Sequence, residues 1–147
     1  MTQEEKQLLF KDLCARLPYG VKVLYTADGL NEICELDSIM TSRKHKDKIF
    51  VSLTLPNDSI MTDIESIKPY LRPMSSMTPE EEYEYHQAKN NDYLEIMNKE
   101  HHEILKSTTL LFSKAIDFLN SHYLDYRGLI EIGLVLEASK DMYDVKY

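Results

Sequence analysis

The stretch Ile49-Phe-Val-Ser-Leu-Thr-Leu55 decides the fold class, because its side chains alternate between apolar and mostly polar types. The aliphatic residues at odd positions would point to one side of an extended chain, and Ser52 and Thr54 would point to the other. Pro56-Asn-Asp58 follows and ends the pattern. This alternation predicts a half-buried β-strand with one face on a core.

Two further strand patterns precede this one. Val21, Val23 and Tyr25 alternate with Lys22 and Thr26, and Asp28-Gly29 is a good hairpin turn. In residues 32–40 the apolar residues do not keep to one face. Cys34, Leu36 and Met40 share a face, and Ile33 and Ile39 lie on the other. This mixture indicates a bulge or a strand that is covered on both sides.

A helix is predicted before these strands. Thr2 and Glu5 have the spacing of a capping box, which would start a helix that runs to about Arg16. Its apolar stripe recurs every four residues, at Leu9, Leu13 and Leu17. This stripe would pack on the predicted sheet.

Two prolines restrict the segment that follows Asp63. Pro69 and Pro73 exclude both a long helix and a strand in the middle of a sheet. We expect a single helical turn and then a short edge strand around Tyr70 and Leu71. Residues 20–74 would then form one strongly curved antiparallel sheet, which could close into a small barrel of the Src-homology type.

The second half of the chain is predicted to be helical. Thr78-Pro79-Glu80-Glu81 combines a cap, a proline at the first helical position and a capping-box glutamate. A long helix would follow, and its apolar seam over residues 94–118 could pack internally or form a homodimer. Leu129–Leu136 would form a short C-terminal helix. The predicted class is therefore α+β, with a helix-plus-sheet domain over 1–78 and a helical region over 79–147 that packs on it. The alternative is a single compact unit.

The charge of the chain limits its partners. The net charge of −8 disfavours a general affinity for nucleic acid or for anionic membranes, both of which require a basic surface. The densest basic run, Arg43 to Lys48, is expected to be a solvated hairpin loop. The N-terminal residues are acidic instead of signal-like, and no apolar run is long enough for a membrane span, so we expect a cytoplasmic protein. Cys14 and Cys34 should then be reduced, unpaired and mostly buried.

The residues expected of an enzyme are not found in the sequence. Four scattered glycines cannot supply a phosphate-binding loop, and two cysteines are too few for a cysteine-based zinc site. His101 and His102 are adjacent, so on a helix they would point about 100° apart and could not easily share a metal ion. We therefore assign no catalytic residue, metal or cofactor.

Two basic and aromatic segments remain as a candidate ligand site. Residues 67–78 and 122–130 both carry apolar residues that need cover, so we expect the two segments to pack against each other. A small molecule or nucleotide would then contact cationic and aromatic side chains, namely Lys68, Tyr70, Arg72, Tyr126 and Arg127. Alternatively, Arg72 and Arg127 would form separate internal ion pairs.

Three stretches resemble a family of short proteins from gut bacteria and their phages. They are residues 13–22, residues 67–78 (Ile-Lys-Pro-Tyr-Leu-Arg-Pro-Met-Ser-Ser-Met-Thr), and residues 117–130 with the tail to Tyr143. The resemblance implies a biological context but no chemistry. Taken with the missing catalytic groups, it favours a non-enzymatic phage or mobile-element accessory protein that acts by protein–protein interaction. The alternative is a small-molecule or nucleotide-binding module, for example a sponge that counters a defence signal.

Overall fold

The computed structural model describes residues 1–45, 47–97 and 113–143, with only the backbone for residues 91–97. It has an α+β fold. The described α-helices are α1 (Gln3–Arg16), α2 (Pro79–Met97) and α4 (Ser113–Ser121). The described strands are β1 (Lys22–Tyr25), β2 (Glu32–Thr41), β3 (Ile49–Thr54), β4 (Ser59–Asp63), β5 (Ile67–Leu71) and β6 (Leu136–Glu137).

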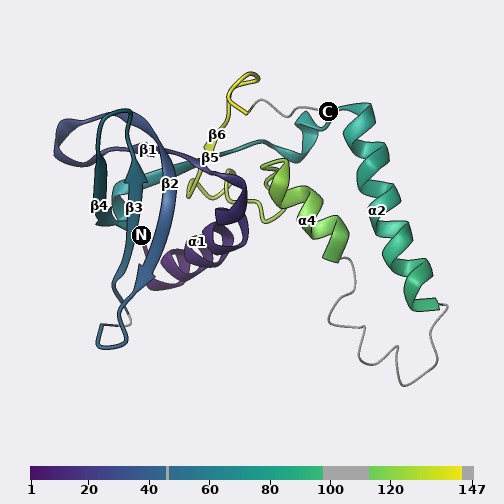
Figure 1. Ribbon diagram of the computed structural model, residues 1–147, viewed down its shortest axis with the longest axis horizontal. Helices are drawn as coiled ribbons and strands as arrows, with labels where there is room; N and C mark the ends of the chain where they lie inside the picture. The colour runs from purple at the N-terminus through teal and green to yellow at the C-terminus, as the bar shows by residue number, and fades with distance from the viewer. Residues whose placement is uncertain (46, 98–112, 144–147) are drawn as a thin grey trace.

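The strands form one sheet in the order β4-β3-β2-β1-β5-β6. Neighbours from β4 to β5 are antiparallel, which confirms the antiparallel sheet predicted for the N-terminal half, and β6 joins β5 in parallel. The predicted barrel closure is wrong, because the sheet is open, with β4 at one edge and β6 at the other (Figure 1). Strand β6, from the C-terminal part of the chain, pairs with the edge of β5, and closing the barrel would require β4 to pair there instead.

The alternation in β3 appears as predicted. Ile49, Val51 and Leu53 are at most 1% exposed, whereas Thr54 is exposed. The register of β2 against β3 shifts between Leu36 and Ser38, which confirms the bulge. The shift explains the mixed pattern in β2, because it changes which residues face the core on either side of it.

Strand β5 differs from the prediction. A 3₁₀ turn at Ile64–Ser66 precedes it as expected, but β5 pairs with β1 on one side and β6 on the other, so it is not an edge strand. Strand β6 pairs only with Tyr70 and Leu71. On the β6 side of β5, no strand therefore lies beside Pro69, so the missing N–H of the proline removes no hydrogen bond to β6.

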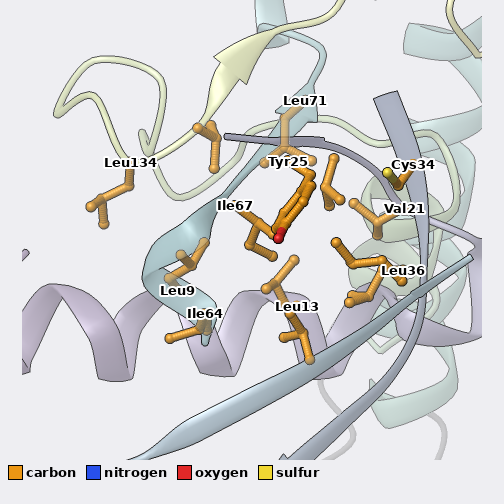
Figure 2. Packing of buried hydrophobic residues seen from close by; sticks show 14 of the residues in the cluster. Leu9, Leu13, Val21, Tyr25, Cys34, Leu36, Ile64, Ile67, Leu71 and Leu134 are labelled. Carbon is orange, nitrogen blue, oxygen red and sulfur yellow. The ribbon is translucent and has the colours of Figure 1, made fainter. Parts of the chain in front are cut away.

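Helix α1 covers one face of the sheet. Thr2 and Glu5 form both hydrogen bonds of the capping box, and Leu9 and Leu13 are fully buried in the core (Figure 2). Figure 2 also shows Ile64, Ile67 and Leu134 in the same cluster, so residues from both halves of the chain build a single core. Each buried leucine contributes about 2 kcal/mol of transfer free energy to folding.

The predicted long helix is not seen as one helix in the described residues, which contain α2 and α4 in its place. α2 ends at Met97, and α4 packs against it, with the Tyr85 and Phe118 rings 6.2 Å apart between centroids. Because α2 and α4 lie side by side (Figure 1), a single helix that continues from α2 to α4 is excluded. Most of the seam over residues 94–118 lies outside the residues whose side chains are described.

The predicted C-terminal helix is also wrong. Gly128 and Gly133 have φ angles of +70° and +75°, and the residues between them form turns. The Asp125 carboxylate accepts hydrogen bonds from the amides of Leu129 and Ile130 at 2.9 and 2.8 Å. These turns place Leu134 and Val135 in the core and lead directly into β6.

The cysteines are both free, as predicted, but only one is buried. Cys34 lies in the core, whereas Cys14 is exposed, so the expectation of burial is wrong for Cys14. Cys14 follows Leu13 on α1, which turns it about 100° away from the apolar stripe. Partial desolvation raises the pKa of the Cys14 thiol, and desolvation followed by the charge of Glu32 raises the pKa of Cys34.

These pKa shifts give a prediction for thiol labelling. The thiolate is the reacting form, so iodoacetamide should alkylate both cysteines slowly at neutral pH. Labelling of Cys14 should accelerate about tenfold per pH unit while the pH remains below its thiol pKa. Mass spectrometry of the native protein should find Cys14 labelled before Cys34 at every pH. Equal labelling, or labelling of Cys34 first, would contradict the placement of α1.

Candidate functional site

The two segments predicted to pack against each other do meet. The Arg72 amide donates to the Tyr123 carbonyl at 2.8 Å, and the Asp125 amide donates to the Arg72 carbonyl at 2.8 Å. These bonds make a parallel bridge between Arg72 and Leu124. The expectation that residues 67–78 and 122–130 contact each other is therefore confirmed.

Arg72 uses its whole guanidinium group inside the protein. Its Nη1 and Nη2 atoms bind the two Glu81 carboxylate oxygens at 2.9 and 2.7 Å. The remaining donors reach the Ser76 hydroxyl, the Ser76 carbonyl and the His122 carbonyl at 3.1 to 3.3 Å. An arginine side chain has five N–H donors, and all five are engaged here.

Glu81 has two roles in this arrangement. Besides binding Arg72, its carboxylate accepts the Thr78 amide at 2.9 Å, and the Thr78 hydroxyl accepts the Glu81 amide at 3.2 Å. These bonds are the capping box that the sequence predicts. The Glu81 side chain is only 2% exposed, so the start of α2 is fixed to Arg72 through a nearly buried ion pair.

A pocket of about 400 Å³ opens beside Arg72. Its walls come from the segment that leads into α2 and from the chain after β6. The pocket is lined by charged residues and by small polar or apolar residues, together with Tyr143: Arg72, Pro73, Ser76, Thr78, Glu81, Glu137, Ala138, Ser139, Lys140 and Tyr143. An anionic ligand here would have to compete with Glu81 for Arg72 and would meet Lys140 as the other cation of the lining.

Tyr143 attaches the described C-terminal segment to the sheet. Its hydroxyl donates to the Tyr70 carbonyl at 2.8 Å and accepts from the Lys22 amide at 3.0 Å. Its ring stacks on Tyr123 with the centroids 3.6 Å apart. Burial, the largest cause, raises the pKa of Tyr143 well above its usual range, so it remains a neutral hydrogen-bonding residue. Sequence reasoning missed this anchor, because a tyrosine near a chain end gives no local signal.

Tyr126 and Arg127 belong to a second cluster, at α1. The Asp12 carboxylate binds Arg16 at 2.8 and 3.1 Å and Arg127 at 3.1 Å. Arg16 also donates to the Leu124 carbonyl at 2.9 Å. The Tyr126 ring lies 5.3 Å from the Arg16 guanidinium and 5.1 Å from that of Arg127, within the range of cation–π attraction. Arg127 is thus paired separately from Arg72.

Sequence reasoning missed the buried ion pair of Asp12 with Arg16. Both side chains are 0% exposed, and charged residues are almost never fully buried unless they are paired. The available signal was their i,i+4 spacing beside the apolar stripe of the first helix. A buried partner on the same helix turn explains how α1 can bury an arginine.

The remaining two candidate residues lie elsewhere. Lys68 is exposed, and its Nζ approaches the Gly133 carbonyl at 3.4 Å. Tyr70 contributes its carbonyl to Tyr143. The structure therefore brings only Arg72 to the pocket lining and places Tyr126 with Arg127 at α1. Whether any of the five binds a ligand stays a prediction.

A second candidate surface is the face of the sheet opposite α1. Met61, Ile33 and Met40 are 64%, 54% and 38% exposed. Met40 lies directly opposite Phe50 in the register, and Met61 lies opposite Ser52, diagonal to Phe50. We call Met40, Phe50 and Met61 the open-face band. Large apolar side chains at neighbouring positions of a sheet are a common feature of recognition surfaces.

Among the residues that the structure describes, no group of His, Cys, Asp and Glu could hold a metal ion. The pair His101 and His102 lies outside these residues. No helix in the described part of the chain is long and apolar enough to span a membrane.

The ion pair of Arg72 with Glu81 gives a prediction for stability. Glu81→Gln keeps the shape of the side chain but removes the charge that binds Arg72 and caps α2, so it should lower the free energy of unfolding by about 2 kcal/mol. Glu80→Gln is the matched control, because Glu80 is exposed in the same helical turn, and it should cost about 0.5 kcal/mol or less. Urea denaturation measures both. Equal effects would show that the Arg72 pair does not hold this segment.

Comparison with known proteins identifies no relative. A scan against protein-family models gave no match for this chain, and searches of curated proteins and of solved structures gave none either.

Proposed function

We propose that this chain is a non-enzymatic binding domain that acts by contact with another protein. The observation that carries the proposal is the open-face band, where Met40 and Met61 expose large apolar side chains on one face of a regular sheet. Burying such surface against a partner would be favourable, by roughly 25 cal/mol per Å² of apolar area. From the resemblance to proteins of gut bacteria and their phages we further propose that the chain is an accessory protein of a phage or mobile element and acts in the cytoplasm.

The proposal gains support from the way the arginines are used. Arg72 pairs with Glu81 and Arg127 pairs with Asp12. Two guanidinium groups that already have carboxylate partners have less need of an anionic ligand than two unpaired ones. Their role is then to hold the fold that presents the sheet.

The alternative is a module that binds a small molecule or nucleotide, and the pocket beside Arg72 favours it. Its volume of about 400 Å³ is within the range of small-molecule sites. Binding would require Lys140 and a rearranged Arg72 to face the ligand. A homodimer through residues 94–118 is a third possibility for the same chain and would be seen in its oligomeric state.

Capture from cell extract tests the protein-binding proposal. The double variant Met40→Ser/Met61→Ser should lose proteins that the unaltered chain retains, because it removes apolar contact area. Ile116→Ser/Ile132→Ser is the matched control, since these residues are 39% and 53% exposed on other elements, and it should retain the same proteins. All four positions are on the surface, so each change should affect stability by about 0.5 kcal/mol or less.

Two results would reject the proposal. One is the same set of captured proteins for both double variants. The other is a rise in melting temperature with a nucleotide that disappears in Lys140→Gln, because a ligand that binds the folded state stabilises it. That second result would favour the alternative.

A further inference from the structure

Strand β4 is an unprotected edge of the sheet. Its outer side pairs with no strand among the described residues, and its five pairs with β3 run in continuous register. Natural edge strands are commonly blocked by proline, lysine, a bulge or extreme shortness. Ser59-Ile-Met-Thr-Asp63 contains no proline or lysine and has no bulge against β3. The Ser59 amide donates to the Asp58 carboxylate at 2.7 Å, and the rest of the outer side of β4 is available for another strand.

Asp63, the acidic residue of β4, already has a hydrogen-bond donor. The Asp63 carboxylate accepts the Glu65 amide at 2.9 Å and caps the 3₁₀ turn that follows. One oxygen of the carboxylate is thus directed toward its own turn. It does not block the edge as an outward carboxylate would.

A basic loop lies at one end of β4. The hairpin between β2 and β3 carries four cations and one carboxylate from Arg43 to Lys48, in a chain of net charge −8. Phe50 lies opposite Asp63 in the register, so the loop that precedes Ile49 is at the Asp63 end of β4. Arg43, Lys44 and Lys48 are exposed there. The local field at this corner is therefore opposite in sign to that of the whole protein.

We propose that β4 binds an extended acidic segment of a partner protein as an additional strand of the sheet. The inference rests on the proposed function and names the mode and the chemistry of the partner. Backbone hydrogen bonds to the edge would supply affinity, and side chains at alternate positions would supply specificity. Apolar residues on one face of the added strand would lie beside Met61, and acidic residues near the end would face the loop.

A second copy of the chain fits this corner less well. Pairing β4 with itself about Met61 would bring together two molecules that each carry a net charge of −8. A short acidic segment, in contrast, would be attracted by the basic loop from Arg43 to Lys48. It would add much less electrostatic repulsion than a whole acidic domain. The partner segment is therefore the occupant to which the inference commits.

Selection of a displayed library of short random peptides on the full chain tests the inference. The enriched peptides should be acidic and should alternate apolar with polar residues. One enriched peptide is then synthesised in two forms, N-methylated at its even or at its odd residues. Only the set whose amides face β4 should abolish binding measured by fluorescence anisotropy, because an added strand shares one edge with the sheet. Arg43→Gln/Lys44→Gln should weaken the unmethylated peptide about tenfold at low salt.

The control variant Lys11→Gln/Lys89→Gln removes the same amount of charge from other exposed positions and should leave the affinity unchanged. No enrichment, enrichment of basic peptides, or equal loss with both methylation patterns would overturn the inference. If peptides bind through Met40 and Met61 without dependence on methylation pattern, strand addition fails while the proposed protein-binding function stands. A dimer in sedimentation analysis that Met61→Lys dissociates would assign the edge to a second copy instead.

Discussion

The structure depends on a buried carboxylate that lies between two arginines. Asp12 binds Arg16 and Arg127, and Arg16 extends the contact to the Leu124 carbonyl. Charged groups with 0% exposure are costly to desolvate, and removing one member of such a cluster leaves the others uncompensated. Asp12 therefore fixes where the segment around Leu124 can lie relative to α1.

From this cluster a continuous series of polar contacts crosses the molecule. Leu124 bridges Arg72, Arg72 binds Glu81, and Glu81 caps α2. The same segment continues through the turns that Asp125 stabilises to β6, which completes the sheet beside β5. Helix α1, the start of α2 and the far edge of the sheet are thus linked by ion pairs and hydrogen bonds in addition to the shared apolar core. Arg72 and Arg127, two of the cations predicted to bind a ligand, are thus paired with carboxylates of the fold.

The sequence was sufficient for features that depend on local patterns. The alternation of Ile49 to Leu55, the capping box of Thr2 and Glu5, and the cap at Thr78 each specify one element without knowledge of the rest. The contact between residues 67–78 and 122–130 was predictable for another reason: both segments carry apolar residues that their own elements cannot bury.

The missed features depend on partners that are distant in the chain. Strand β4 has only two apolar residues, Ile60 and Met61, and becomes a strand because β3 offers it a ladder. β6 is two residues long and exists only because β5 is there to pair with it. The position of Glu81, three residues after Thr78, predicted a capping residue. Nothing near it in the sequence indicated that Arg72 would be its partner. For the candidate site, sequence could name the cations but could not show which carboxylates would bind them.

Amide hydrogen exchange of the Asp12→Ala variant tests the dependence on this cluster most directly. Without Asp12, the segment around Leu124 should open more readily, so the amides of Arg72 and Asp125 should exchange faster than in the unaltered chain. The amides of Val51 and Leu53, in β3, which β2 and β1 separate from β5 and β6, should accelerate much less. Unchanged exchange at Arg72 and Asp125, or equal acceleration at all four amides, would contradict the account.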